Sequence, residues 1–134
     1  MHESFENLAN EYKTLLTEIK LLENSRIELK EKSEYYAASF LSHTPKGSSR
    51  HNTFDKYLIT LEKIEDKIIE TLLKVSQKRL RIEAQINNIN NEKVRCIIRM
   101  RVVNGCSWQD VASAMHISAS TAKRKYIQAL SREA

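Results

Sequence analysis

The chain has 134 residues, of which only two are glycine and one is proline, and this scarcity of turn-forming residues excludes a β-sandwich or a β-barrel. Hydrophobic residues make up 41% and charged residues 29%, a balance that fits amphipathic helices better than a disordered chain. The net charge of +5 is concentrated at one end: residues 1–92 contain 14 Lys/Arg and 15 Asp/Glu (−1), whereas residues 93–134 contain 8 and 2 (+6). We therefore expect an all-α protein with a basic C-terminal part, the part suited to a polyanion such as nucleic acid.

Apolar residues recur from residue 5 to residue 40 at largely alternating spacings of three and four. The stripe skips Arg26 and comprises Phe5, Leu8, Tyr12, Leu15, Ile19, Leu22, Leu29, Tyr36 and Phe40. A stripe this narrow is typical of a coiled-coil seam, so the pattern predicts a long helix that pairs with another helix.

Residues 41–53 break this pattern and hold the only proline and one of the two glycines. The segment predicts a connecting loop of about 13 residues, which is near the upper limit for a connection without regular structure.

A second apolar stripe follows the loop and predicts a second helix of similar length, roughly 50 Å at 1.5 Å per residue. It comprises Leu58, Leu61, Ile64, Ile68, Leu72, Val75, Ile82, Ile86 and Ile89. The two helices either fold back as a hairpin or pair as a coiled coil with another chain, and the sequence leaves both open. Flanking apolar residues remain at the edges of the seam, so we expect a homodimer or a higher oligomer; they include Leu16, Leu21, Ile59 and Ile69.

Four asparagines near residue 90 mark the end of the second helix or the cap of the next, because asparagine favours caps over helix interiors. They are Asn87, Asn88, Asn90 and Asn91. We place a domain boundary here, with a helical oligomerisation region at 1–90 and a DNA-binding domain at 91–134. The latter opens with a helix that Gly105 ends.

Residues 107–130 have the pattern of a helix-turn-helix. Ser107 and Asp110 resemble a capping box at the start of a short helix that ends near Met115. His116 is the turn residue, since histidine tolerates a left-handed conformation, and Ser118 caps the next helix. Small or apolar residues stand where the two helices must cross closely; they are Val111, Ala112, Met115, Ile117 and Ala122, with Trp108 as a further core residue.

The exposed face of the last helix carries mainly hydrogen-bonding and cationic groups. Ser120, Thr121, Arg124 and Gln128 lie on it, Lys123 and Lys125 lie towards its edges, and Ile127 is the one apolar exception. Arg124 is suited to a bidentate contact with guanine, whereas the lysines, Ser107 and Gln109 are suited to phosphates. The expected DNA-binding set is Ser107, Gln109, Ser118, Ser120, Thr121, Lys123, Arg124, Lys125 and Gln128. Taken alone, the basic run at 123–125 would also fit a solvated helix face; the agreement of caps, small residues and charge favours DNA.

No catalytic or metal-binding pattern is present. The two cysteines, Cys96 and Cys106, and the nearby His116 lack zinc-ligand spacing, so we expect reduced cysteines and neither metal nor cofactor. There is no Gly-rich phosphate loop and no nucleophile beside a base, so an enzyme is not expected. No apolar run approaches the roughly 20 residues that cross a bilayer, and the N-terminus does not resemble a signal peptide, so we expect a cytoplasmic protein without membrane contact.

The segments Gly105–Ala112 and Ser118–Arg124 resemble the helix-turn-helix of sigma factor region 4. The whole layout resembles small regulators of Gram-positive phages and prophages, the ArpU and RinA-like group, closely over residues 92–130 and in outline before them. This resemblance implies activation of phage or prophage genes, with Thr121, Lys123 and Arg124 on a recognition helix and Ser107 and Gln109 near the DNA backbone. His116 and Ala122 depart from the sigma-like pattern, which has glycine and a larger aliphatic residue there.

Two functions follow from these expectations. The first is a sequence-specific transcriptional regulator that binds double-stranded DNA as an oligomer, with RNA polymerase left open as a further partner. The second is a phage DNA-packaging adaptor of the small terminase subunit kind, which would form rings and have weak sequence preference. In that adaptor pattern the DNA-binding unit usually comes first, whereas here it comes last, so regulation is favoured.

Overall fold

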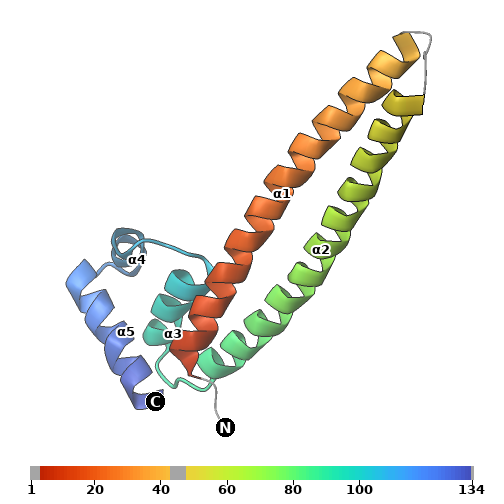
Figure 1. Ribbon diagram of the computed structural model, residues 1–134. Helices are drawn as coiled ribbons and strands as arrows, with labels where there is room; N and C mark the ends of the chain where they lie inside the picture. The colour runs from red at the N-terminus through yellow and green to blue at the C-terminus, as the bar shows by residue number, and fades with distance from the viewer. Residues whose placement is uncertain (1–3, 43–47, 134) are drawn as a thin grey trace. The chain divides into compact units, whose positions relative to one another are not determined.

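The computed structural model describes the backbone of residues 4–42 and 48–133, and within these ranges it is helical, with no strand. The predicted all-α class and the two long helices are therefore confirmed. The helices are α1 Phe5–Ser42, α2 Ser48–Asn87, α3 Glu92–Ile98, the π-helical turn η1 Arg99–Val103, α4 Trp108–Met115 and α5 Ala119–Glu133 (Figure 1). None of these helices has a stretch long and apolar enough to span a bilayer.

The predicted loop at 41–53 is too long. Helix α1 continues to Ser42 and α2 begins at Ser48, so both ends of the expected loop are helical, and its middle, residues 43–47, lies outside the described residues. The reason is local: the proline and the glycine both fall within 43–47, whereas residues 48–53 contain neither and do not stop a helix.

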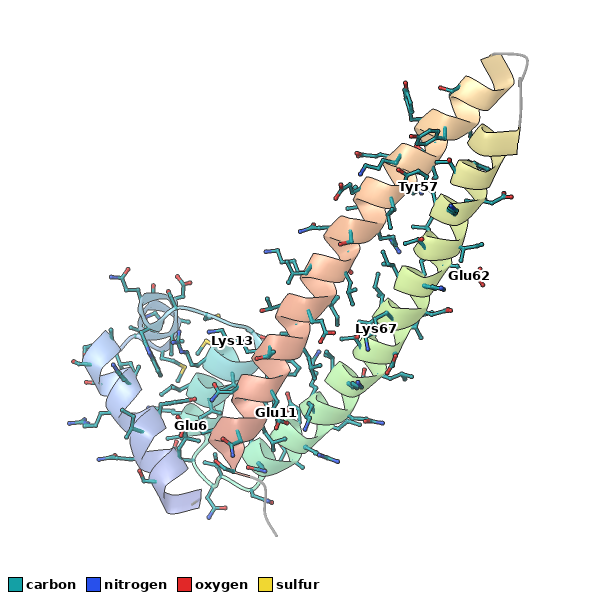
Figure 2. All side chains as sticks on the ribbon, in the orientation of Figure 1. Glu6, Glu11, Lys13, Tyr57, Glu62 and Lys67 are labelled. Carbon is teal, nitrogen blue, oxygen red and sulfur yellow. The ribbon has the colours of Figure 1, made fainter. Side chains whose placement is uncertain are left out.

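The chain divides into two compact units, which are described separately: residues 15–74, and residues 4–14 with 75–133. In the first unit, α1 and α2 run antiparallel as a helical hairpin (Figure 1). Tyr36 of α1 stacks on Tyr57 of α2, with ring centroids 5.2 Å apart and an interplanar angle of 26°. Ile19 and Ile68 are buried, whereas Glu62 and Lys67 are exposed on α2 (Figure 2).

The inner row of α2 differs from the predicted stripe at two positions. Leu58 and Leu72 are 41% and 46% exposed, and the hairpin instead takes Tyr57 and Thr71 into its interior. Thr71 fits there because its hydroxyl donates to the Lys67 carbonyl oxygen at 2.8 Å, which satisfies its only polar group. The row of α2 that the hairpin buries therefore keeps a strict three-and-four spacing, and Leu58 and Leu72 lie outside that row.

The second unit combines the start of α1 and the end of α2 with α3, η1, α4 and α5. Its buried apolar residues include Phe5, Leu8, Tyr12, Ile82, Ile86 and Ile98. Lys78 forms an ion pair with Glu11, and Arg99 donates to Glu83 with Nη2 and Oε2 2.7 Å apart. The predicted boundary at 90–91 coincides with the break between α2 and α3, but this unit extends across it; the two-domain division stays a prediction.

Candidate nucleic-acid interface

Helix α3 begins where the asparagine run predicted a cap. The Asn91 side-chain oxygen accepts from the backbone N–H groups of Lys93 at 2.9 Å and Val94 at 3.3 Å. The helix continues into η1, where Asn104 N–H donates to the Arg99 carbonyl oxygen at 3.1 Å in the wider π-helical pattern. Gly105 follows with φ of +66°, as expected for a residue that ends a helix, whereas no residue pattern predicts the π-helical turn.

Helix α4 has the predicted serine cap and the predicted turn residue. The Ser107 hydroxyl oxygen accepts from the Asp110 N–H at 3.1 Å. At the other end, His116 adopts the left-handed conformation, with φ of 57° and ψ of 41°. The Ile117 N–H donates back to the Ala112 carbonyl oxygen at 3.1 Å, which closes the turn.

Helix α5 begins at a serine cap as well. The Ser118 hydroxyl oxygen accepts from the Thr121 N–H at 3.1 Å, and its proton is donated to the Thr121 hydroxyl oxygen at 2.7 Å. Both of these hydrogen bonds of the Ser118 hydroxyl are therefore made within the cap, which defines where α5 begins.

The expected core holds α3, α4 and α5 together. Ile97, Val111 and Ala122, one from each helix, are fully buried, and Ala112 is nearly so. Partly buried side chains surround them: Met100, Cys106, Trp108, Met115, Ile117 and Tyr126. Because Ala122 has no exposed surface, a larger side chain there would separate α5 from its neighbours.

Trp108 is a core residue, as predicted, and it has a cationic neighbour that the sequence did not reveal. The Arg101 guanidinium lies 4.8 Å from the indole centroid, and its Nη1 donates to the Cys106 carbonyl oxygen at 2.9 Å. Tyr126 meets the indole edge to face, with centroids 5.2 Å apart. Burial raises the pKa of the Tyr126 phenol, and Arg101 opposes this shift.

The outer face of α5 brings together four of the nine residues expected to bind DNA. Ser120, Lys123, Arg124 and Gln128 are exposed and line one shallow hollow of about 310 Å³ together with Ile127. Within the described part of the chain, Lys123, Arg124 and Gln128 have no hydrogen-bond or ion-pair partner, so their polar groups are available to a ligand.

The other expected site residues are placed differently. Gln109 and the cap residue Ser107 are exposed at the start of α4. Thr121 is half-buried beside Ser118. None of the described residues forms a cluster of three or more His, Cys, Asp or Glu side chains suited to a metal ion.

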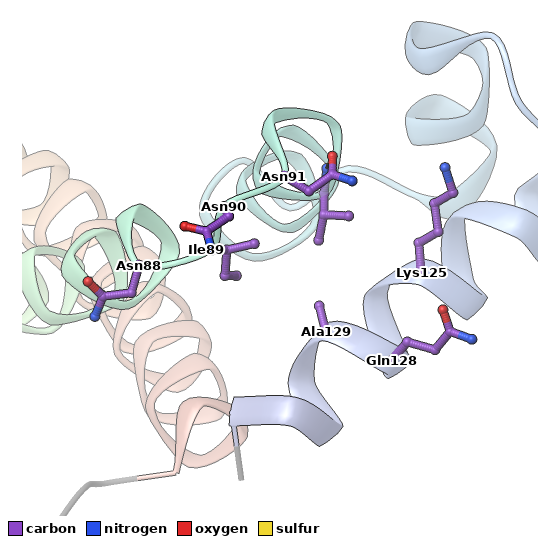
Figure 3. A pocket seen from close by; sticks show the side chains of 8 residues that line it. Asn88, Ile89, Asn90, Asn91, Lys125, Gln128 and Ala129 are labelled. Carbon is purple, nitrogen blue, oxygen red and sulfur yellow. Dashed lines mark hydrogen bonds between the residues drawn. The ribbon is translucent and has the colours of Figure 1, made fainter.

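Lys125 lies on another side of α5 from the hollow that contains Arg124. It is half-buried and, with Gln128 and Ala129, lines a pocket of about 400 Å³ beside the segment between α2 and α3 (Figure 3). The remaining lining residues are Asn88, Ile89, Asn90, Asn91 and Val94. The sequence marks these asparagines as helix caps or breaks and does not reveal that they line one pocket with residues of α5.

Comparison with known proteins adds one finding. A family model described as "Protein of unknown function (DUF1492)" matches residues 37–132, which is more than half of the chain. No curated protein and no solved structure matches the chain. The chain belongs to the DUF1492 family.

Proposed function

We propose that the protein is a sequence-specific DNA-binding transcriptional regulator. In this proposal α4, the turn at His116 and α5 form a helix-turn-helix, and α5 enters the major groove. One observation carries it: two serine-capped helices cross over the buried residues Val111 and Ala122, and the outer face of the second presents two cations and an amide that have no partner among the described residues. The +6 charge of residues 93–134 supports binding to the phosphate backbone.

The chemistry of each side chain indicates whether it contacts a base or a phosphate in this proposal. Arg124 is central on the outer face and suits a bidentate contact to guanine, whereas Lys123 suits a phosphate. Ser107 and Gln109 lie at the N-terminus of α4, where exposed amides also favour a phosphate. Lys125 points to the flank of α5 and contributes to phosphate binding there, not to base reading.

In this proposal copies of the chain associate through the hairpin of α1 and α2. Five apolar residues of α2 are exposed, and at 3.6 residues per turn they fall within an arc of about 140°, which places them on one side of the helix; they are Leu58, Ile59, Ile69, Leu72 and Leu73. An exposed apolar row of this kind marks a protein contact. Pairing through it gives a homodimer or a higher oligomer whose DNA-binding units read two half-sites.

The C-terminal segment resembles regulators of the ArpU and RinA-like group. This resemblance supports a role in activating phage or prophage genes in the cytoplasm. RNA polymerase is the corresponding protein partner. A packaging adaptor is the competing function. It differs from a regulator because it predicts DNA binding with weak sequence preference.

Fluorescence anisotropy tests this proposal. Wild-type protein, Arg124→Ala and Arg26→Ala are titrated at about 150 mM salt against upstream duplexes from the source genome and against random duplex. Arg26 is exposed on α1, so its replacement changes the charge equally without touching α5. We expect tight binding to one fragment, weakened about tenfold or more only by Arg124→Ala. Equal, salt-sensitive binding to every duplex indicates an adaptor, and no binding removes the proposal.

A further inference from the structure

Ile127 is an exposed apolar side chain on the face of α5 that is otherwise polar. It is 52% exposed, although isoleucine is among the residues most often buried. Ser120 and Arg124 precede it by seven and three residues, so all three lie on one side of the helix. Ile127 also lines the same shallow hollow as both of them.

A protein partner is a poor match for this surface. Protein interfaces depend on clusters of buried aromatic and aliphatic residues, and lysine and carboxylate side chains are depleted at their centres. Ile127 instead lies in a hollow with Lys123, Arg124 and Gln128. One apolar side chain among two cations and an amide suits a ligand whose surface is polar and anionic and carries isolated apolar groups.

The major groove of DNA is such a surface. The thymine 5-methyl is the apolar group among the hydrogen-bonding positions of the base edges, and apolar side chains contact it. Resting on the function proposed above, we infer that Ile127 is a specificity-determining residue that selects a thymine through this methyl group. Three residues along α5 correspond to about 4.5 Å, close to one base-pair step of roughly 3.4 Å. The thymine therefore lies one or two steps from the guanine that Arg124 reads.

Deoxyuridine differs from thymidine only by the missing 5-methyl group, so replacing one by the other tests the contact directly. Full-length protein first selects duplexes from a random-sequence pool, and each thymine of the selected duplex is then replaced in turn by deoxyuridine. For the wild type we expect one replacement near the Arg124 guanine to raise Kd about fourfold, the effect of one buried methyl. Ile127→Ala should bind the thymine and deoxyuridine duplexes equally at that position.

The outcomes separate the inference from the function beneath it. If the wild type selects a sequence but no deoxyuridine weakens binding, or if Ile127→Ala retains the fourfold difference, the thymine contact is wrong while the DNA-binding proposal stands. If no sequence is selected, both are overturned. Circular dichroism of Ile127→Ala checks that the helices persist, as expected for an exposed position.

Discussion

The Arg101 guanidinium lies over the Trp108 ring, 4.8 Å from its centroid, and so connects the π-helical turn η1 to the first residue of α4. The same guanidinium donates to the Cys106 carbonyl oxygen at 2.9 Å. The Arg101 side chain of η1 thus contacts both the segment before α4, at Cys106, and the first residue of α4, Trp108. This segment sets where α4 starts, and therefore where the proposed DNA-binding face lies.

Replacement of Arg101 should loosen this connection. Arg101→Ala removes a cation–π contact and a hydrogen bond, and we expect the free energy of unfolding to fall by about 1–2 kcal/mol. Arg101→Lys keeps the charge but not the planar fork, so it should recover only part of the loss. Urea unfolding followed by the emission of Trp108, the only tryptophan, measures both. An unchanged midpoint for Arg101→Ala would show that the contact does not stabilise the fold.

Ala122 should not tolerate a larger side chain. It is fully buried against Ile97 and Val111, so Ala122→Leu should overpack the core and lower the free energy of unfolding by about 1–3 kcal/mol. Ala114→Leu is the matched control, because Ala114 is exposed on α4 and the same change there should stay within about 0.5 kcal/mol. Thermal unfolding by circular dichroism compares the two, and equal stabilities would contradict the close crossing of α4 and α5.

The ion pair between Glu83 and Arg99 should make stability depend on pH. The hydrogen bond from Arg99 lowers the pKa of Glu83, so its stabilisation is present above the ordinary carboxylate pKa and is lost as pH falls through the lowered value. Glu83→Gln should cost about 0.5–1 kcal/mol at pH 7, since both side chains are partly exposed.

That difference should be smaller at about pH 3, because the loss begins below the ordinary carboxylate pKa. Glu62→Gln, at an exposed position of α2, is the control and should show little difference at either pH. Urea unfolding at both pH values is the measurement. A Glu83→Gln effect that is the same at low pH would mean that the side chain acts through packing and not through its charge.

The sequence predicted the helix termini near the candidate site correctly, because capping depends on a few neighbouring residues. Asn91, Ser107 and Ser118 cap the helices expected, and His116 has the left-handed conformation expected. The buried Ala122 could likewise be predicted, since its spacing from the caps places it where two helices cross. Local chemistry and short-range spacing were sufficient for these features.

Features that depend on residues distant in the chain were not predictable. Leu72 is apolar and fits a helical stripe, yet the hairpin register places Thr71 inside, because the partner helix decides which row is buried. The sequence pattern places both Lys123 and Lys125 towards the edges of the exposed face of α5, but Lys125 lines the pocket beside Asn88. The π-helical turn has no glycine or proline to mark it, and its wider hydrogen bonding follows from packing around it.

The exposed row on α2 should control association and not folding. Leu72 and Leu73 are 46% and 61% exposed in the single chain, so their replacement by lysine costs little in the hairpin but places charges in the proposed interface. We expect the double variant to keep its helical circular dichroism while its association weakens at least about tenfold. Ile27→Lys, at a 52% exposed isoleucine on α1 outside this row, is the control that should leave association unchanged. Sedimentation velocity at micromolar concentration measures the oligomeric state. A monomeric wild type would remove the oligomer proposal, and an effect of Ile27→Lys equal to that of the double variant would show that the row is not the interface.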